Sequence, residues 1–368
     1  MYKGTGISKD QLSDDGEPCI LYGELYTKYK SETIREVISK TNIDNTKLVR
    51  SKANDVIIPC SGETAEDIAT ARCVLNGNIL LGGDLNIIRL HGYDGTFMSY
   101  QLNGRRKYDI AKVAQGVSVV HLYGEHLKGV KTINPCLKEQ KKIASLLALL
   151  DERIATQNKI IDKLQSLIKG INHRVFMNSA NNYKLGEICE IRSGYSGSQL
   201  LSKKGLKVSR IETISGHKVN MERVGYVAPF ESSENYRLRV GDILFSNINS
   251  VEYIGNTAFI DKDYDLYHGM NLLRLTPNHM VVIPFYLYLL LNTNRMLNRF
   301  KTVCNKAVSQ ASINQTELGK TVVQIPPINT QEQICELYQA LYTKLETEIH
   351  TKSLFQNHKQ YMLRQMFI

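Results

Sequence analysis

Glu139, Gln140 and Lys141 are the residues whose spacing comes nearest to that of a catalytic centre. The same Glu-x-Lys spacing occurs in many nucleases, where carboxylates hold a metal ion that activates water. No Pro-Asp pair precedes these residues, and they lie within a predicted long helix. A solvent-exposed helix face is therefore the better interpretation, and a stand-alone nuclease is the least favoured function.

No other pattern in the sequence predicts catalysis. The chain contains no G-x-x-x-x-G-K-S/T, G-x-G-x-x-G, H-E-x-x-H or G-x-S-x-G motif. Pro326-Pro327 follows Ile325, so the Asn/Asp-Pro-Pro-aromatic motif of amino-methyltransferases is absent. Nine histidines lack metal-ligand spacing, and seven cysteines form no C-x-x-C pair, which indicates reduced, mostly buried thiols of a cytoplasmic protein. We expect a non-enzymatic chain without a metal or cofactor of its own.

Basic residues give a stronger signal, for binding. The stretch from Leu266 to Thr316 has no acidic residue, and a basic cluster at the corresponding place in the first half repeats the pattern. Such stretches attract phosphate, while Asn, Gln and Arg can also contact base edges. A plain basic helix face and a simple turn remain the alternatives. The candidate DNA contacts are Arg105, Arg106, Lys107, Lys112 and Gln115, and then Arg295, Arg299, Lys301, Asn305, Lys306, Ser309, Gln310 and Asn314.

Two long helices must position these clusters. Apolar residues recur in alternating steps of four and three after Pro135, which predicts a helix of about ten turns and roughly 50 Å. A second such segment follows Pro326-Pro327 and becomes polar at Glu348. The first seam has one polar position, Gln157. The seam residues are Ile143, Leu147, Leu150, Ile154, Ile161, Leu164, Ile168 and Ile171 in the first helix, and Ile334, Tyr338, Leu341 and Leu345 in the second.

The two halves are related by an internal repeat. Pro135, Gln140 and Ile143 match Pro326, Gln331 and Ile334 at a constant offset of 191 residues. Upstream, the segments 54–57 and 86–90 resemble 241–244 and 271–275. We therefore predict one globular-unit-plus-helix module written twice.

The expected fold class is α+β, with two tandem α/β domains and two long coiled-coil helices. Short apolar runs at 56–58, 79–81, 243–245 and 257–260 predict strands, and 285–300 predicts one helix after Pro284. The predicted boundaries are 1–134 for the first domain, 135–178 for the central helix, 179–325 for the second domain and 326–368 for the distal helix.

Composition agrees with a folded protein that has a polyanionic partner. The 368 residues carry 42% hydrophobic and 22% charged side chains, with a net charge of +10. The pI near 9.1 favours a polyanionic partner without identifying it, and the mean hydropathy of −0.25 predicts no membrane span. Residues 128–174 hold much of the excess positive charge, and they face either DNA or a partner subunit, or simply solvent.

With these features in place, the chain resembles the specificity subunits of type I restriction-modification systems. The segments that carry the resemblance are 4–10, 20–27, 139–147, 150–154, 325–327 and 331–334, above all the duplicated Pro-to-Glu-Gln-x-x-Ile junction. The resemblance implies two target-recognition domains that are separated by two long antiparallel coiled-coil helices and that read a bipartite, asymmetric DNA site. It also implies separate modification subunits that bind S-adenosylmethionine and methylate adenine, and restriction subunits that cleave DNA.

One departure from the family pattern concerns the first unit. The second unit opens with Tyr183 to Arg192, and the first begins directly at Gly4-Thr5-Gly6 without a counterpart. We expect this chain to be short at its amino end, with an exposed sheet edge. Two alternatives stay open: a truncated or silent phase-variable specificity chain, and a coiled-coil scaffold that binds RNA or protein.

Overall fold

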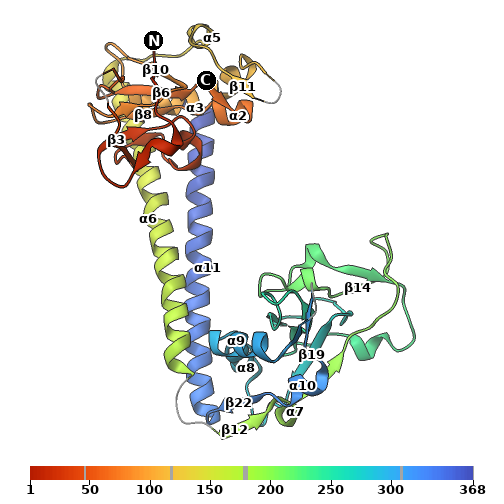
Figure 1. Ribbon diagram of the computed structural model, residues 1–368. Helices are drawn as coiled ribbons and strands as arrows, with labels where there is room; N and C mark the ends of the chain where they lie inside the picture. The colour runs from red at the N-terminus through yellow and green to blue at the C-terminus, as the bar shows by residue number, and fades with distance from the viewer. Residues whose placement is uncertain (45–46, 117–118, 177–180, 307–309, 368) are drawn as a thin grey trace. The chain divides into compact units, whose positions relative to one another are not determined.

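The computed structural model describes residues 1–44, 47–116, 119–176, 181–306 and 310–367. The chain divides into two compact units (Figure 1). Unit 1 comprises Met1–Ile161 together with Thr347–Ile368, and unit 2 comprises Asp162–Glu346. Each unit therefore contains a globular part and one end of each long helix. No helix in the described ranges is both long enough and apolar enough to cross a membrane.

Unit 1 is built on a five-stranded sheet in the order β1-β10-β6-β8-β4, in which only the outer pair β4 and β8 is parallel. Its strands are β1 (Tyr2–Lys3), β10 (Leu85–Ile88), β6 (Asp55–Pro59), β8 (Arg72–Val74) and β4 (Thr33–Ile34). A second sheet has the order β2 (Leu12–Ser13), β5 (Ser39–Thr41), β3 (Glu17–Ile20) and β9 (Leu80–Leu81), and β7 (Ser61–Gly62) pairs with β11 (Val120–His121). The helices of the globular part are η1 (Lys9–Gln11), α1 (Glu24–Thr27), α2 (Ala65–Ile68), α3 (Gly95–Asn103), α4 (Arg106–Lys112) and α5 (Gly124–Lys128).

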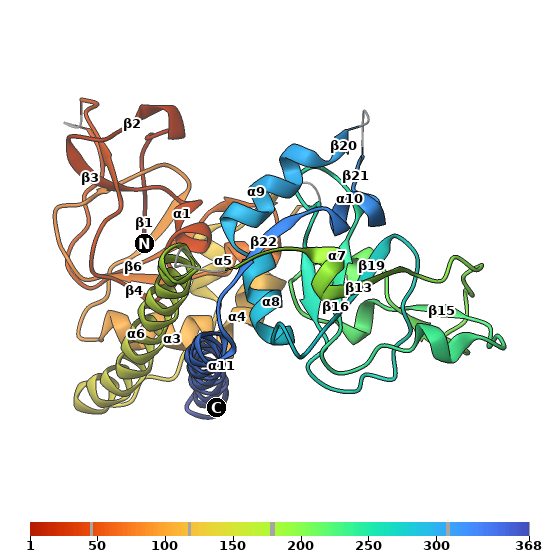
Figure 2. The ribbon, with the colours of Figure 1, turned by 90° about the horizontal axis from the view of Figure 1, so that it is seen from below.

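Unit 2 has an antiparallel four-stranded sheet in the order β13 (Cys189–Ser193), β19 (Leu272–Pro277), β16 (Ile243–Ser246) and β18 (Thr257–Phe259). Smaller sheets pair β12 (Asn181–Lys184) with β22 (Val322–Ile325), β14 (Leu206–Val208) with β15 (Gly225–Val227), and β21 (Ala311–Ser312) with both β17 (Ile248–Asn249) and β20 (Asn305–Lys306). The helices are α7 (Leu185–Ile188), η2 (Ile211–Ile214), η3 (Met221–Arg223), η4 (Ser233–Tyr236), α8 (Pro284–Leu291), α9 (Asn294–Val303) and α10 (Gln315–Gly319). In both ribbon views α8 and α9 lie between this sheet and the long helices (Figure 2).

The predicted strands are confirmed, and the repeat extends into the sheets. Within the main sheets, β10, β6 and β8 hold the same order and pairing as β19, β16 and β18. The turn before the middle strand is also the same. Asn54 and Gly241 both have positive φ, and the carboxylates of Asp55 and Asp242 accept backbone N–H bonds of 2.7 and 2.8 Å from three residues upstream.

The predicted match between residues 86–90 and 271–275 is wrong by two residues. Strand pairing places Asn86 with Leu273 instead, and the residues that correspond to one another before the strands are Asp84 and Asn271. Both of these have positive φ, 56° and 64°. A shift of two residues keeps every side chain on the same face of a strand, so the apolar pattern alone cannot detect it.

The first strand of unit 1 corresponds to the end of β13. Tyr2 pairs with Ile87 as Arg192 pairs with Arg274. A close backbone contact follows in both units: a Cβ on Gly4 would lie 2.0 Å from the carbonyl oxygen of Gly82, and one on Gly194 would lie 1.8 Å from that of Gly269. Only glycine permits this approach. The described residues of unit 1 contain no counterpart of β12, α7 and the first part of β13.

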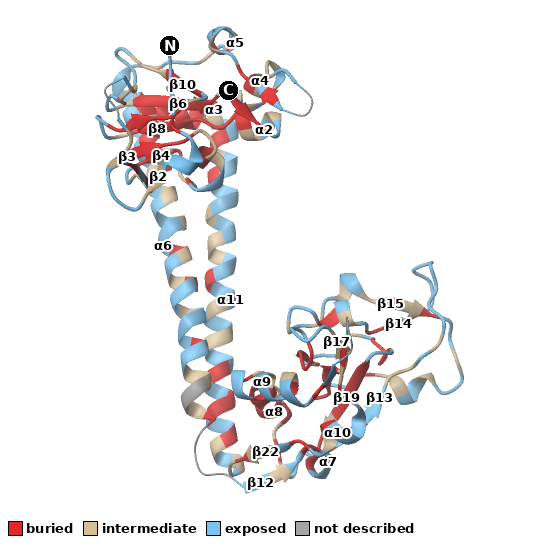
Figure 3. Ribbon diagram, viewed as in Figure 1, coloured by how far each residue is buried: buried red, intermediate tan, exposed pale blue. Residues whose placement is uncertain are grey.

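The long helices are α6 (Leu137–Val175) and α11 (Ile328–Gln365), close to the predicted bounds. All the predicted seam residues are buried or half-buried, and buried and exposed positions alternate along both helices (Figure 3). In unit 1, Leu147 of α6 belongs to the same apolar cluster as Leu363 of α11. In unit 2, Ile168 and Tyr338 share a cluster. The contact partners rise along one helix as they fall along the other, so the helices are antiparallel.

Two local predictions are wrong. The segment 285–300 forms two helices, because the Thr293 hydroxyl accepts the N–H of Met296 at 3.4 Å and so caps a new helix. Gln140 does not lie on a solvent-exposed face: it is 1% exposed, while Glu139 and Lys141 beside it are exposed.

Candidate nucleic-acid interface

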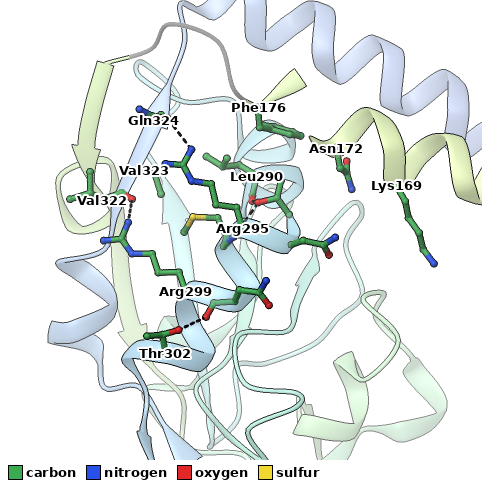
Figure 4. Close-up of a pocket in the computed structure, with 14 residues that line it drawn as sticks. Lys169, Asn172, Phe176, Leu290, Arg295, Arg299, Thr302, Val322, Val323 and Gln324 are labelled. Atoms are coloured by element: carbon green, nitrogen blue, oxygen red, sulfur yellow. Dashed lines mark hydrogen bonds between the residues drawn. The ribbon is translucent and has the colours of Figure 1, made fainter. Parts of the chain in front are cut away.

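The basic residues of α9 line a pocket of about 690 Å³ in unit 2 (Figure 4). Arg295, Arg299 and Thr302 are spaced four and three residues apart, so they lie on one face of the helix. Lys169 of α6 and residues 322–324 of β22 complete the walls. Three cations and no described carboxylate line this pocket, so it favours an anion.

Both arginines are held in place by β22. The Nη1 atom of Arg295 donates to Gln324 Oε1 at 3.3 Å, and that of Arg299 donates to the carbonyl oxygen of Val322 at 2.9 Å. A guanidinium has five N–H donors, so one bond to β22 leaves donors for a phosphate. The pocket floor is apolar, with Phe176 and Met296 among its residues.

Unit 1 has a pocket of about 600 Å³ at the equivalent place, beside α4 and the end of α11. Arg105 and Lys107 line it together with Arg364 of α11, and Glu66 is also present. Gln360 of α11 stands where Lys169 stands in α6 at the repeat offset of 191 residues. The two basic clusters found in the sequence therefore occupy matching positions in the two units.

The remaining candidates of unit 1 lie outside this pocket. Arg106 turns toward Asp109 with an ion pair of 3.4 Å, and its Nε atom is buried without a hydrogen-bond partner. Lys112 is exposed at the end of α4. Gln115 is exposed as well, while its backbone pairs with His121 through bonds of 2.9 and 2.7 Å. Of the predicted residues in this unit, the structure brings together Arg105 and Lys107.

The polar loop of unit 2 forms a separate surface. Asn305 and Lys306 are exposed on β20, and Gln310 is exposed before β21. Lys301 is half-buried on another face of α9. Asn314 caps α10, because its Oδ1 atom accepts the N–H of Glu317 at 2.8 Å. Ser309 lies outside the described residues.

The glutamine of the repeated junction locks each globular part onto its long helix. Gln140 Oε1 accepts the N–H of Asp94 at 2.9 Å, and its Nε2 donates to the Pro135 carbonyl at 2.7 Å. Gln331 makes the same two bonds, with the N–H of Ile283 and the Pro326 carbonyl, both at 2.8 Å. Since α4 and α9 directly follow the helices that begin here, this buried amide sets where both basic clusters stand.

The core of unit 2 contains a buried histidine, His268. Burial lowers the pKa of His268 to about 4, so the ring is neutral near pH 7. Its Nε2 atom lies 2.9 Å from the Leu272 carbonyl oxygen. Among the described residues no group of three or more His, Cys, Asp or Glu side chains could hold a metal ion. The cations around the two pockets can bind an anion.

Sequence reasoning missed two cations, Lys169 and Arg364. Both come from the ends of the long helices, and each lies in the pocket of its own unit. For Lys169 the signal was the excess of positive charge along residues 128–174, which by itself does not distinguish a solvated face from a pocket wall. Arg364 lies outside that stretch.

Comparison with known proteins supports the resemblance seen in the sequence. Residues 177–353 match the model described as "Type I restriction modification DNA specificity domain". The resemblance to type I specificity subunits is thus confirmed.

Relatives extend the similarity to the rest of the chain. A protein of Methanocaldococcus jannaschii, provisionally named the type I restriction enzyme MjaX specificity subunit, is 38% identical over 188 residues, which is 50% of this chain and 44% of that protein. The match thus spans less than half of that relative. The type I restriction enzyme MjaVIII specificity subunit of the same organism is 22% identical over 92% of this chain and 83% of its own length.

Solved structures share the fold. The type I restriction-modification S subunit from M. genitalium superposes with a TM-score of 0.62 at 17% identity, covering all of this chain and 93% of that one. A structure from work on complex assembly and conformational transition of the type I R-M system gives a TM-score of 0.58, also at 17% identity, over 90% and 86% of the two chains. The expected fold class is confirmed.

Proposed function

We propose that this chain is the DNA-specificity subunit of a type I restriction-modification complex and reads a bipartite, asymmetric site in double-stranded DNA. One observation carries the proposal: two globular units of one repeat present cation-lined pockets at matching positions. The family of unit 2 supports it. A scaffold for RNA or protein would not need two such units whose exposed loops differ.

Each unit docks on one half-site. Arg295, Arg299 and Lys169 in unit 2, and Arg105, Lys107 and Arg364 in unit 1, hold phosphates and set the orientation. The exposed polar side chains nearby, Asn305, Lys306 and Gln310 in unit 2 and Gln115 in unit 1, contact base edges. The two sets differ in residue type and number, so the half-sites differ in sequence.

The long helices set the distance between half-sites. The 39 residues of α6 span about 58 Å at 1.5 Å per residue. The groove of duplex DNA repeats about every 34 to 36 Å, so half-sites separated by unread bases suit a helix of this length.

In this proposal the partner subunits carry out the methylation and cleavage reactions. The chain acts without catalysis of its own, modification subunits bind S-adenosylmethionine and methylate adenine, and a restriction subunit translocates and cleaves DNA. The outer faces of α6 and α11 recruit the modification subunits. Exposed Leu146, Leu149 and Leu167 on α6 and Leu337, Ile349 and Leu354 on α11 supply apolar contact area there.

The direct test is a methylation map. The chain is co-expressed with its modification subunit in a host that lacks other adenine methylation, and methylated adenines are mapped across the genome. The expected result is one split, asymmetric motif that disappears when this chain is omitted. Methylation that does not depend on this chain, or none at all, contradicts the proposal.

A further inference from the structure

A buried ion network joins the globular part of unit 1 to both long helices. Lys359 of α11 lies 2.5 Å from a carboxylate oxygen of Glu32 and 2.6 Å from one of Asp151 on α6. The side chains of Lys359, Glu32 and Asp151 are 9%, 8% and 13% exposed. One cation therefore connects the loop before β4 with the two helices.

Other groups complete the network. The Tyr100 hydroxyl of α3 donates to Asp151 at 2.6 Å, and the Ser31 hydroxyl donates to the same carboxylate oxygen at 3.2 Å. Arg72 of β8 is buried nearby and bonds the carbonyl oxygens of Leu25 and Tyr29. Burial raises the pKa of Glu32, and Lys359 opposes that effect. Lys359 is thus the cation that contacts both carboxylates in the interior.

Unit 2 has no such network at the corresponding positions. At the repeat offset of 191 residues, Lys359 corresponds to Ile168 and Asp151 to Tyr342. Both belong to the apolar cluster of unit 2. In the matching sheets, strand pairing places Ala258 where unit 1 has Arg72. The network is therefore specific to unit 1, although the main-sheet strand order and the long helices around it are repeated in unit 2.

The network selects one register of the helix pair. If α11 slipped along α6 by one heptad, Lys359 would face Ala144 or Asn158, neither of which is charged. Glu32 would then be buried without its cation. Gln157, whose amide donates to Glu348, would face an apolar residue instead. Buried polar pairs of this kind fix register where apolar seams tolerate a slip.

We propose that Lys359, together with Glu32 and Asp151, determines the number of unread base pairs between the two half-sites, by holding the globular part of unit 1 at one register on the helix pair. The inference rests on the proposed function and adds residues that set the spacing. An apolar contact, as in unit 2, can shift by a fraction of a turn at little cost, whereas three buried charges cannot.

The experiment measures spacing preference directly. The chain with its modification subunit is bound to duplexes that carry the mapped half-sites, with the spacer unchanged or altered by one base pair. The tested variants are Lys359→Met and the triple variant Glu32→Gln, Asp151→Asn, Lys359→Met, which removes the three charges of the ion network together and leaves Arg72 its two bonds to the Leu25 and Tyr29 carbonyls. Lys352→Met, on the same helix, is the matched control, and Lys359→Arg tests rescue by a conserved charge.

We expect the wild-type chain, the control and Lys359→Arg to prefer the unchanged spacer by at least about tenfold. The triple variant should prefer it by less than about threefold, with the half-site sequences unchanged. An unchanged preference overturns the inference. Loss of binding to every duplex also overturns it, because the network would then support folding rather than spacing. Absence of a split motif for the wild-type chain contradicts the proposed function instead, so the two failures are distinguishable.

Discussion

The two units share a frame, by which we mean the order of the main-sheet strands, the junction glutamine and the close glycine contact. They differ in the side chains that pack between these elements. Gln140 and Gln331 make the same two hydrogen bonds, and Gly4 and Gly194 make the same close backbone contact. Apolar side chains join the helix ends in both units, and unit 1 adds a buried ion network. The comparison teaches that backbone geometry requires particular residues at a few positions, whereas the core between them accepts either solution.

The outer parts differ even more. Unit 1 adds a four-stranded sheet of β2, β5, β3 and β9, while unit 2 adds the β14–β15 hairpin. Next to that hairpin the rings of Tyr195 and Phe230 stack with centroids 3.9 Å apart, and Tyr236 packs edge-on against both. Such differences outside a shared frame are what two unlike half-sites would require.

Placing a lysine in unit 2 at the position that corresponds to Lys359 of unit 1 should have the largest effect on stability. Ile168→Lys buries an ammonium with no carboxylate at the matching position, so we expect a loss of about 3–5 kcal/mol in unfolding free energy. Adding Tyr342→Asp should recover at least about 1 kcal/mol, because it recreates the pair. Urea unfolding with hydrogen exchange of unit 2 peptides measures both. Exposed Gln165→Lys is the control, and an equal effect of the control would refute the expectation.

Acid should weaken unit 2 through His268. The folded pKa of about 4 lies below the ordinary value of 6.5, so the unfolded chain binds the proton more tightly. The stabilisation is complete above pH 6.5 and is lost as the pH falls toward 4, by roughly 3 kcal/mol. Strand pairing and the matching glycine contacts place Leu81 at this position in unit 1.

His268→Leu should therefore remove this part of the pH dependence. Urea unfolding of the wild-type and variant chains at pH 7.5 and pH 4.5 measures it, and exposed His279→Leu is the control. If wild-type and His268→Leu chains lose equal stability between these pH values, His268 is not the cause.

Removing the junction glutamines tests whether the frame is equivalent in the two units. Gln140→Ala and Gln331→Ala each leave a buried N–H and a carbonyl unpaired, so we expect a loss of about 2–3 kcal/mol from each. Protection against hydrogen exchange at the start of α3 and of α8 measures the two effects. The exposed neighbours Lys141→Ala and Glu332→Ala should change little. A large effect in one unit only would show that the frame is unequal.

The smallest expected effects concern DNA affinity. The double variants Arg295→Ala with Arg299→Ala, and Arg105→Ala with Lys107→Ala, should each weaken binding by roughly threefold to tenfold and reduce the salt slope by about 2. Fluorescence anisotropy at several salt concentrations measures both quantities, after circular dichroism has verified folding. Lys138→Ala with Lys142→Ala, two exposed cations of α6, is the matched control. Unchanged binding would exclude the pocket concerned.

Local patterns determined the long helices and the repeat. The steps of four and three after Pro135 predicted α6 almost to the residue, because a helical period is written in consecutive side chains. The same holds for the strand around Val56. Where a pattern has a period of two, as at 86–90, the sequence left the register undecided by two residues.

The sequence by itself determined two helices, a duplicated module and two basic clusters, because these depend on neighbours along the chain. Only the tertiary structure decided that Lys169 joins Arg295 and Arg299, that Asn314 caps a helix, and that Lys359 is buried between two carboxylates. The two contacts of Lys359 join residues 208 and 327 positions apart. Tertiary packing decides which residues meet in these contacts, so residue spacing along the chain does not predict them.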